Sequence, residues 1–313
     1  MKRVVTNAVK RLLARAFAVG QRLGVDILPR HFYSEIPDLR KLRRTSDWRQ
    51  PFSMIDVSGA DPDQQLAFVR SLITDDIRRR IARGGIYATA CARNGEPGYG
   101  PVEADILYAF VCTQRPQRIV QIGCGVSTAV CLLAASEAGY RPEMTCVEPY
   151  PNAFLRTATQ TGEITLISKP VQTLDYGFLA DLGPGDLFFV DSSHTLGPAG
   201  EVTRIVLEML PRLAAGVRVH FHDIWFPYDY SGGILDGELF FWHETALLHA
   251  YLVGNRRARI LASLSMLHYA RRAELAQLIP TYRPRAEKDG VATGPGHYPS
   301  SIFLEVSDQE PRA

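Results

Sequence analysis

The stretch Arg118-Ile-Val-Gln-Ile-Gly-Cys-Gly-Val-Ser-Thr128 decides how this chain is interpreted. Residues 118–122 are a short apolar run typical of a buried strand, and a helical pattern follows over residues 127–139. Between them, Gly123 and Gly125 allow the backbone to turn sharply and to approach a ligand closely. The stretch therefore predicts a ligand-binding turn that joins a strand to a helix.

The same alternation of short apolar segments and helical patterns continues on both sides of this turn. Strands are predicted over residues 118–122, 144–147, 164–167, 187–190, 217–222 and 301–306. Helices are predicted over residues 61–83, 102–111, 127–139, 151–160, 198–213 and 243–254. This alternation predicts an α/β fold, a Rossmann-like, doubly wound and mostly parallel sheet with helices on both faces.

Two regions lie outside this core, which covers about residues 100–225. Residues 1–60 combine a basic amphipathic helix with an extended arm that several prolines interrupt, and residues 61–313 are predicted to form the main domain. Within that domain, residues 226–282 are interpreted as an aromatic and helical insertion before the final strand at 301–306. The aromatic residues near 225–242 are interpreted either as a lid hinged at Gly232-Gly233 or as core.

The composition is that of an ordinary globular protein with little net charge. Of the 313 residues, 46% are hydrophobic and 22% are charged, which excludes disorder over most of the chain. The formal net charge of +2 gives no electrostatic argument for nucleic-acid binding. Five cysteines without zinc-ligand spacing predict reduced thiols in a cytoplasmic protein, and no apolar run is long enough for a transmembrane helix.

The first 25 residues are basic and amphipathic. Six lysines and arginines precede the first acidic residue, Asp26, and they interrupt the apolar residues too often for a signal peptide. One interpretation is peripheral contact of residues 1–25 with an anionic membrane. The other, which we favour at this point, is packing on the protein's own body or on a second subunit in a homo-oligomer, because amphipathic helices more often face protein.

Polar residues follow the next two strands at positions suited to a nucleoside ligand. Glu148 ends the second strand, where a carboxylate can accept hydrogen bonds from a ribose diol, and Val171-Gln172 follow the third strand, where an adenine edge can be read. A dinucleotide site would need a third glycine where Thr128 stands, which disfavours a nicotinamide cofactor. Ligands of open α/β sheets bind at these strand ends, so the joint occurrence predicts one nucleoside site.

These residues resemble class I S-adenosylmethionine-dependent methyltransferases over about residues 100–225. A largely uncharacterised bacterial group of that superfamily is more similar still, through five short elements: His31-Phe-Tyr-Ser34 with Ile36-Pro37, Gly123-x-Gly125-x-Ser127-Thr128, His220-Phe-His-Asp223, Pro227-x-x-Tyr230 and Trp242-His-Glu244. The resemblance implies S-adenosylmethionine as cofactor and a seventh strand, residues 301–306, inserted antiparallel at the sheet edge. The cofactor contacts it implies are Gln121, Gly123, Gly125, Ser127, Thr128, Glu148, Val171, Gln172 and Asp191.

Gln121 departs from the pattern of the family. Many of these methyltransferases have an acidic residue at its position, where the carboxylate helps to hold the methionine end of the cofactor. A glutamine at position 121 accepts hydrogen bonds but carries no charge. Recognition of the ribose is therefore the firmer expectation.

A second group of polar residues follows strands four and five. Asp191-Ser-Ser-His194 and His222-Asp223 are expected at one rim of the sheet, beside the position of a sulfonium methyl group. Asp191 and Asp223 can hold Mg²⁺, which would position and acidify a substrate hydroxyl. His194 can instead act as general base with an ordinary pKa near 6.5. Alternatively, both aspartates cap helices or bind loop amides.

This layout resembles metal-dependent O-methyltransferases that act on catechols or on macrolide sugars, in which an Asp-x-x-His matches Asp191 and His194. The resemblance implies methyl transfer to a small-molecule acceptor, most simply at a hydroxyl, with His194, Asp191 and Asp223 as catalytic residues. Two other classes stay open: an NAD(P)-dependent oxidoreductase and a non-catalytic protein of the same fold that binds the cofactor or a partner. The sequence does not name the acceptor.

Overall fold

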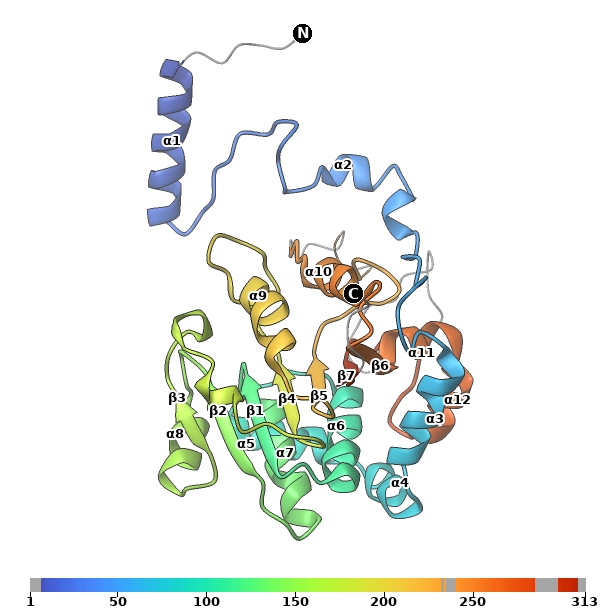
Figure 1. The fold of residues 1–313 in the computed structure, drawn as a ribbon. Coiled ribbons are helices and arrows are strands. Elements are labelled where there is room, and N and C mark those ends of the chain that lie inside the picture. The colour runs from blue at the N-terminus through green and yellow to red at the C-terminus, as the bar shows by residue number, and fades with distance from the viewer. Residues whose placement is uncertain (1–6, 232–233, 235–239, 285–297, 309–313) are drawn as a thin grey trace. The chain divides into compact units, whose positions relative to one another are not determined.

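The computed structural model describes residues 7–231, 234, 240–284 and 298–308 (Figure 1). The chain forms two compact units, Met1–Thr45 and Ser46–Ala313. In the first unit lie α1 (Asn7–Arg22) and the single turn α2 (Leu39–Leu42), which Asp38 caps through the amides of Arg40 and Lys41. The domain boundary that the sequence analysis placed near residue 60 stays a prediction.

A seven-stranded sheet organises the second unit, in the order β3-β2-β1-β4-β5-β7-β6 (Figure 1). Its first five strands are parallel: β1 (Arg118–Ile122), β2 (Glu143–Val147), β3 (Thr165–Ile167), β4 (Leu187–Val190) and β5 (Arg218–Phe221). The order reverses between β1 and β4, so ligand-binding loops are expected at the carboxyl ends of these two strands. The predicted Rossmann-like, mostly parallel sheet is confirmed.

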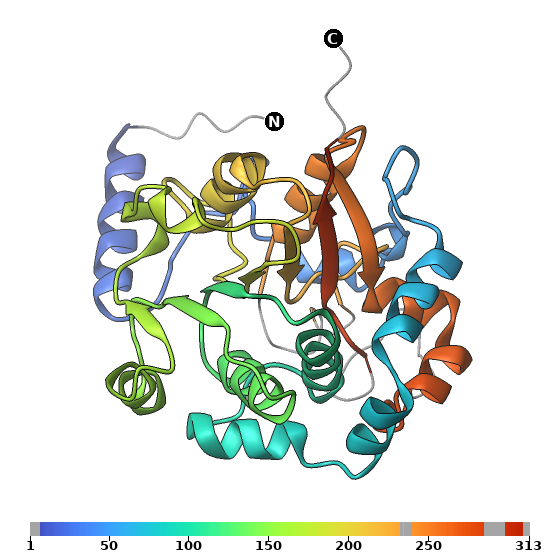
Figure 2. The same ribbon diagram turned by 60° about the horizontal axis from the view of Figure 1, so that its bottom comes forward.

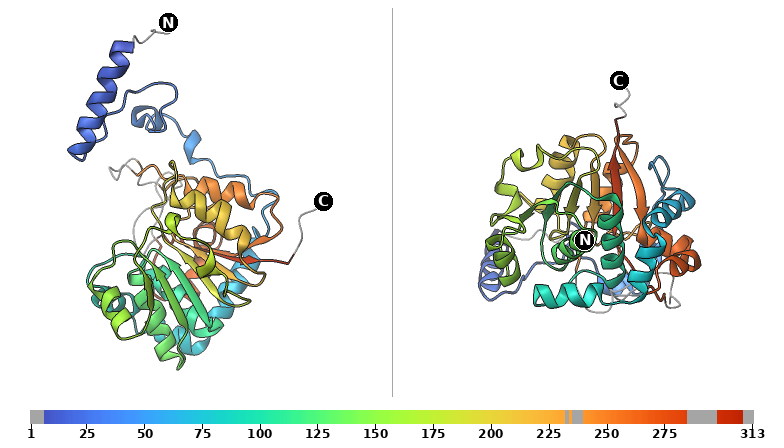
Figure 3. Two further views of the ribbon diagram at one scale, coloured as in Figure 1. Left: turned by 60° about the vertical axis from the view of Figure 1, so that its left-hand side comes forward. Right: turned by 90° about the horizontal axis from the view of Figure 1, so that it is seen from below.

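The last two strands refine the prediction at the sheet edge. β7 (Ile302–Val306) pairs antiparallel with both β5 and β6 (Ala258–Ser263), so the antiparallel strand lies one position inside the edge (Figure 3). The edge strand β6 falls in the segment 226–282, which the sequence analysis interpreted as an insertion. The alternation of charged and apolar residues in Arg257-Ala-Arg-Ile hid this strand, because it lacks the continuous apolar run of the central strands.

Helices cover both faces of the sheet (Figure 2). On one face lie α5 (Ile86–Asn94), α6 (Pro101–Gln114), α7 (Val126–Glu137) and α8 (Ala153–Gln160), with α3 (Pro62–Leu72) nearer the β6 edge. On the other face lie α9 (Glu201–Arg204), its continuation and α10 (Glu244–Leu252). The strands are buried on both sides because alternate side chains enter two separate apolar clusters, as Ile119 and Val120 do.

Two predicted helices are interrupted. The pattern over 61–83 is two helices, α3 and α4 (Asp75–Ala82), because the Thr74 side chain caps a new start by accepting from the Ile77 amide. The pattern over 198–213 is α9 followed by a π-turn, Ile205–Met209, and a 3-10 turn, Leu210–Arg212, in which Pro211 has no amide hydrogen to continue the ladder.

Short elements complete the second unit. They are three 3-10 turns, Asp47–Arg49, Val171–Thr173 and Gly177–Leu179, and two helices, α11 (Leu264–Ala270) and α12 (Arg272–Leu278). All five cysteines are free thiols, in agreement with the prediction. Across the residues that the structure describes, no helix is long and apolar enough to span a bilayer.

Candidate active site

The turn after β1 brings the loops of β1 and β4 into direct contact. Gly123 has a φ of +77°, and a Cβ atom at this position would lie 1.8 Å from the carbonyl oxygen of Asp191. The Asp191 amide in turn donates to the carbonyl of Ile122 at 2.9 Å. Only glycine satisfies both the left-handed backbone and this close approach, so Gly123 fixes the distance between the predicted cofactor turn and the predicted catalytic rim.

Gly125 has different surroundings. Its φ is 168°, and an added Cβ would meet the side chain of Asn94 at 3.3 Å. The expected role of Gly125 in cofactor binding stays a prediction. Of the two glycines in the turn, Gly123 is the one at which an added Cβ would overlap a backbone atom.

Three of the predicted cofactor contacts lie beneath the turn. Gln121 is fully buried, and its Oε1 accepts from the Thr128 hydroxyl at 2.7 Å. The Thr128 hydroxyl oxygen accepts from the Gly125 amide at 3.2 Å. Ser127 is also buried, at 4% exposure. These side chains stabilise the turn from beneath. An uncharged glutamine is sufficient at position 121 for this contact, because it only has to accept the hydrogen bond of the Thr128 hydroxyl.

A cavity of about 610 Å³ opens above the turn. Its wall includes Gly123, Glu148, Val171, Gln172 and Asp191, five of the residues predicted to contact the cofactor. They come from the loops after β1, β2, β3 and β4, and the loop 192–201 closes one side. The structure thus brings together in one cavity the residues that the sequence analysis assigned to a nucleoside.

Glu148 is fixed at the tip of β2 by backbone amides. The Tyr150 amide donates to its Oε1 at 2.9 Å, and the Cys124 amide donates to its Oε2 at 3.4 Å. Each carboxylate oxygen keeps a further lone pair, so the carboxylate can still accept from a diol in the cavity. The bond from Cys124 also couples Glu148 to the glycine turn.

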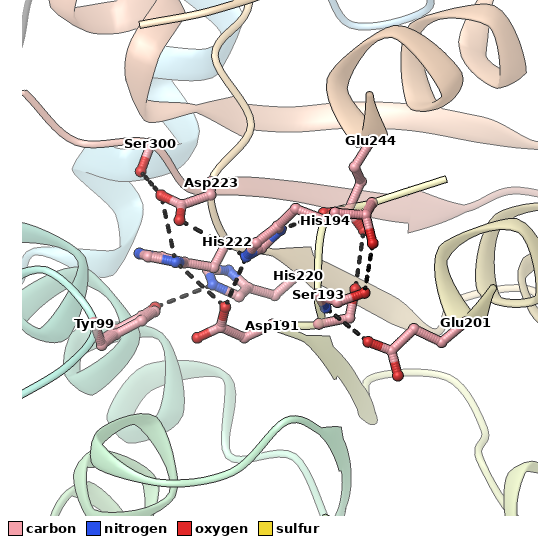
Figure 4. Close-up of polar contacts among 12 residues, drawn as sticks. Tyr99, Asp191, Ser193, His194, Glu201, His220, His222, Asp223, Glu244 and Ser300 are labelled. Atoms are coloured by element: carbon pink, nitrogen blue, oxygen red, sulfur yellow. Dashed lines mark hydrogen bonds and ion pairs between the residues drawn. The ribbon is translucent and has the colours of Figure 1, made fainter. Parts of the chain in front are cut away.

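The rim beside this cavity is organised around His194 (Figure 4). Its Nδ1 donates to Oε2 of Glu244 at 2.6 Å. Its Nε2 lies 3.5 Å from Oδ1 of Asp191 and 3.7 Å from Oδ2 of Asp223. Because Glu244 occupies one ring nitrogen, the other nitrogen is directed toward the two predicted catalytic aspartates.

His222 forms the second link between the same aspartates (Figure 4). Its Nδ1 lies 3.5 Å from Oδ1 of Asp191 and 3.6 Å from Oδ1 of Asp223. Its Nε2 is buried without a hydrogen-bond partner among the described residues. Asp223 also accepts from the Ser300 hydroxyl at 2.8 Å, which fixes its orientation.

The charges of the rim stabilise one another. Burial would lower the pKa of His194, but Asp191 and Glu244 outweigh burial and raise that pKa to about 10. Burial would likewise lower the pKa of His222, but Asp223 and Asp191 raise it to about 9. Burial would raise the pKa of Asp191, yet the two histidines hold it well below its usual range. At neutral pH both histidines are therefore cationic, and His194 departs from the value near 6.5 expected from the sequence.

Backbone strain gathers around the site. Four non-glycine residues with positive φ lie at the cavity or the rim: Tyr99 (58°), His194 (59°), Ala199 (55°) and Asp223 (56°). A left-handed conformation at such a residue costs on the order of 1–3 kcal/mol and persists where the surroundings enforce it. The clustering of strained residues beside one cavity supports a functional role for this edge of the sheet.

Sequence reasoning missed three participants of the rim. Glu244 was recognised only as part of a Trp-x-Glu element. Its contact with His194 was not predicted, because the two residues lie fifty positions apart. His222 was noted only as the neighbour of Asp223. Tyr99, whose hydroxyl lies 3.0 Å from Nε2 of His220, lies outside the elements predicted from the sequence. The sequence signal that could have revealed the contact with His194 is Glu244 itself, because a charged side chain in an apolar segment requires a partner when it is buried.

The aromatic segment after β5 divides between core and rim. Phe226 is fully buried and belongs to the core. Trp242 packs on His194, with ring centroids 4.5 Å apart, and Phe240 stacks on Trp242. The predicted hinge at Gly232-Gly233 lies outside the described residues. Trp242 and Phe240 therefore form an apolar wall next to the catalytic candidates.

The donor set of the rim does not fit Mg²⁺ in this arrangement. Two histidine nitrogens, from His194 and His222, lie between the carboxylates of Asp191 and Asp223. In the part of the chain that the structure describes, no group of three or more His, Cys, Asp or Glu side chains has a geometry that could hold a metal ion. The predicted pair of metal carboxylates is thus held by imidazolium charges, and no step of the chemistry below is routed through a metal.

Comparison with known proteins agrees with this geometry. Residues 120–224 match a family described as "Methyltransferase domain". A protein of Archaeoglobus fulgidus, described as uncharacterized, is 26% identical over 182 residues, which are 55% of this chain and 80% of that protein. The span of the family match begins in β1 and ends just after β5, so it includes the turn, the cavity and the two aspartates.

Two solved structures illustrate the range of proteins found. An SAH-bound methyltransferase of Podospora anserina is 14% identical with a TM-score of 0.38, covering 90% of this chain and 99% of that chain. A branched-chain polyamine synthase of Thermus thermophilus is 18% identical with a TM-score of 0.40, covering 68% of this chain and 59% of that chain. The family match, the sheet order and the glycine turn agree with the predicted resemblance of residues 120–224 to class I S-adenosylmethionine-dependent methyltransferases.

Proposed function

We propose that the protein transfers the methyl group of S-adenosylmethionine to a hydroxyl of a small-molecule acceptor. The observation that carries this proposal is the position of Asp191. It lines the cavity assigned to the cofactor and also contacts both histidines of the rim. A methyl donor in the cavity and an acceptor at the rim would therefore meet at one residue.

The cofactor half of the site would act through position and hydrogen bonding. Glu148, already oriented by two backbone amides, would accept from the ribose diol. Gln172, in the cavity wall, would read the adenine edge, and Val171 would pack against the base. Gly123 would let the backbone approach the ligand without a side chain between them.

The rim would act on the acceptor. The acceptor oxygen attacks the methyl carbon, the carbon–sulfur bond breaks, and S-adenosylhomocysteine leaves with the electron pair on sulfur. The hydroxyl proton passes to Nε2 of a neutral His194, which then becomes the imidazolium that Asp191 and Asp223 stabilise. Because the pKa of His194 is raised to about 10, only a small fraction is neutral at pH 7, and turnover should rise with pH toward that value.

Positioning supplies the other part of the rate. Trp242 and Phe240 offer an apolar surface beside His194, where water would be excluded from the reacting atoms. Alignment of donor and acceptor in such a pocket can contribute about 7–11 kcal/mol to lowering the barrier. An apolar wall next to cationic histidines fits a small-molecule acceptor. Its hydroxyl oxygen would develop negative charge as the proton leaves.

Two binding measurements and one transfer measurement test the proposal. Calorimetry with S-adenosylhomocysteine and, separately, with NADH distinguishes a methyltransferase from an oxidoreductase, and we expect binding of the first alone. Transfer of a labelled methyl group from S-adenosylmethionine is then measured across a library of hydroxyl compounds. Tight binding of NADH would overturn the cofactor assignment. Cofactor binding without transfer to any acceptor class would favour the non-catalytic interpretation.

A further inference from the structure

Charge is distributed very unequally between the two units. Residues 1–45 contain eleven lysines and arginines and three acidic residues, a formal charge of +8. Residues 46–313 contain 24 lysines and arginines and 30 acidic residues, a formal charge of −6. The small net charge of the whole chain is therefore the sum of a basic segment and an acidic body. An anionic surface would attract the basic segment but not the acidic body.

The helix α1 separates its apolar and cationic side chains onto two faces. At about 100° per residue, one arc of the helix contains Val9, Leu12, Ala16, Val19 and Leu23 at spacings of three or four, Leu23 directly following the last helical residue. The opposite arc contains Lys10, Arg11, Arg15 and Arg22. No acidic residue occurs in α1. An apolar stripe flanked by cations alone is the pattern of helices that lie in a membrane interface.

The apolar stripe is exposed at all of its positions except Ala16, which is half-buried. Leu12 is 67% exposed, Val19 is 55% exposed and Leu23 is 77% exposed. The exposure continues after the helix to Phe32, at 92%, and Tyr33, at 82%. Contiguous large apolar side chains at the surface mark an interaction site, and exposed aromatic rings are typical of segments that lie at the level of lipid headgroups.

We propose that α1 and the exposed apolar residues that follow it bind the surface of an anionic bilayer. The helix would lie in the plane of the interface, with Leu12, Val19 and Leu23 at the boundary of the acyl chains and its cations at the lipid phosphates. Sixteen residues make a helix about 24 Å long, and within the described part of the chain no helix qualifies as a membrane span. The contact is therefore peripheral.

Charge complementarity favours lipid over a second copy of α1. If two α1 helices packed with their apolar stripes together, the four cations of each would lie near the four of the other, with no acidic residue in either helix to pair with them. Anionic headgroups supply the missing countercharge along the whole helix. Charge complementarity thus favours a lipid surface over a second α1 helix, which is one of the protein partners considered in the sequence analysis.

Sedimentation of the full chain with vesicles tests this proposal. We expect the protein to sediment with vesicles of phosphatidylcholine and phosphatidylglycerol, and to remain in the supernatant with pure phosphatidylcholine. Raising the salt concentration should weaken the binding, because the cations contribute electrostatically. Leu12→Glu should reduce the partition coefficient about tenfold or more, since a charge then replaces a leucine that the proposal places at the acyl-chain boundary.

A matched variant separates the apolar contribution from net charge. Ala18→Glu changes the charge equally and also lies three residues from Arg15, but it stands on the cationic face. It should weaken binding much less than Leu12→Glu. Circular dichroism melting of both variants is the control, and we expect the melting temperature of the wild type, since neither substitution lies in residues 46–313. This readout does not depend on the proposed enzymatic activity.

Three results would overturn the proposal. The first is equal binding of wild type and Leu12→Glu to anionic vesicles. The second is equal loss in both variants, which would reduce the contact to charge alone. The third is failure of the wild type to sediment with the anionic vesicles. If light scattering then gives the mass of a dimer that Leu12→Glu dissociates, the stripe is assigned to a second copy.

Discussion

The half of the site proposed to bind the cofactor and the half proposed to act on the acceptor are built in different ways. The first is made of backbone turns and the residues next to them, as Gly123 and Glu148 show, and each part lies close in sequence to a strand end. The second is a network of charged side chains from three distant segments, joined through His194 and Asp191. We therefore expect substitutions in the first half to act on cofactor binding and substitutions in the second half to act on turnover.

The largest effect is expected from Gly123→Ala. The new Cβ would lie 1.8 Å from the Asp191 carbonyl, in a left-handed conformation, so the loops of β1 and β4 must separate. Calorimetry should detect no binding of S-adenosylhomocysteine. Gly125→Ala is the matched control, because its Cβ meets only the Asn94 side chain, at 3.3 Å. Equal affinity losses in the two variants would refute the distinction between the glycines.

His194→Gln should leave cofactor affinity nearly unchanged and lower turnover by about 10²–10⁴-fold, the usual contribution of a general base. Initial rates with an identified acceptor, compared with calorimetry on the same variant, measure this separation. Asp223→Asn should behave in the same direction. If His194→Gln weakened cofactor binding as much as turnover, the two halves of the site would not be functionally separate.

Glu148→Ala should weaken binding of S-adenosylhomocysteine by about 1.5–3 kcal/mol, the range for a hydrogen bond to a charged group. The carboxylate is already oriented by the Tyr150 and Cys124 amides, so its removal also loosens the turn. Glu148→Gln, which keeps the size and one acceptor oxygen, should lose less. Unchanged affinity in Glu148→Ala would mean that another residue binds the ribose.

A smaller effect is expected on stability as a function of pH. The pKa of His194 is raised to about 10 in the folded protein and is near 6.5 when unfolded, so the folded state binds more protons between these values. Its stabilisation is therefore fully present below about pH 6.5 and is lost as pH rises through about 10. The destabilisation caused by His194→Gln should be larger near pH 6 than near pH 9, by about 1 kcal/mol or more.

Chemical denaturation at the two pH values measures that difference. A constant difference between wild type and His194→Gln at both pH values would contradict the raised pKa.

Metal removal should have the smallest effect, because the histidines already neutralise Asp191 and Asp223. Turnover measured after dialysis against a chelator should equal that of untreated protein. A loss that Mg²⁺ restores would show instead that the two carboxylates hold a metal during catalysis, as the resemblance to metal-dependent enzymes implied.

The two halves also differ in how far the sequence predicts them. Gly123 and Glu148 could be placed because each directly follows an apolar strand, and Gln172 because it lies in the loop after the next strand. Parallel strands end at one edge of the sheet, so these residues were expected together. The contact between His194 and Glu244 could not be predicted, because it joins a loop to α10 across fifty residues through a segment without periodicity. For the same reason the raised pKa of His194 was beyond prediction, since neighbours distant in sequence set it.

The most direct test of the central claim is a crystal structure of the full chain with S-adenosylhomocysteine. We predict the ribose hydroxyls within hydrogen-bond distance of Glu148, the adenine beside Val171 and Gln172, and the sulfur facing Asp191 and the His194 rim. A ligand bound elsewhere, or one whose sulfur points away from Asp191, would contradict the proposal that cofactor and acceptor meet there.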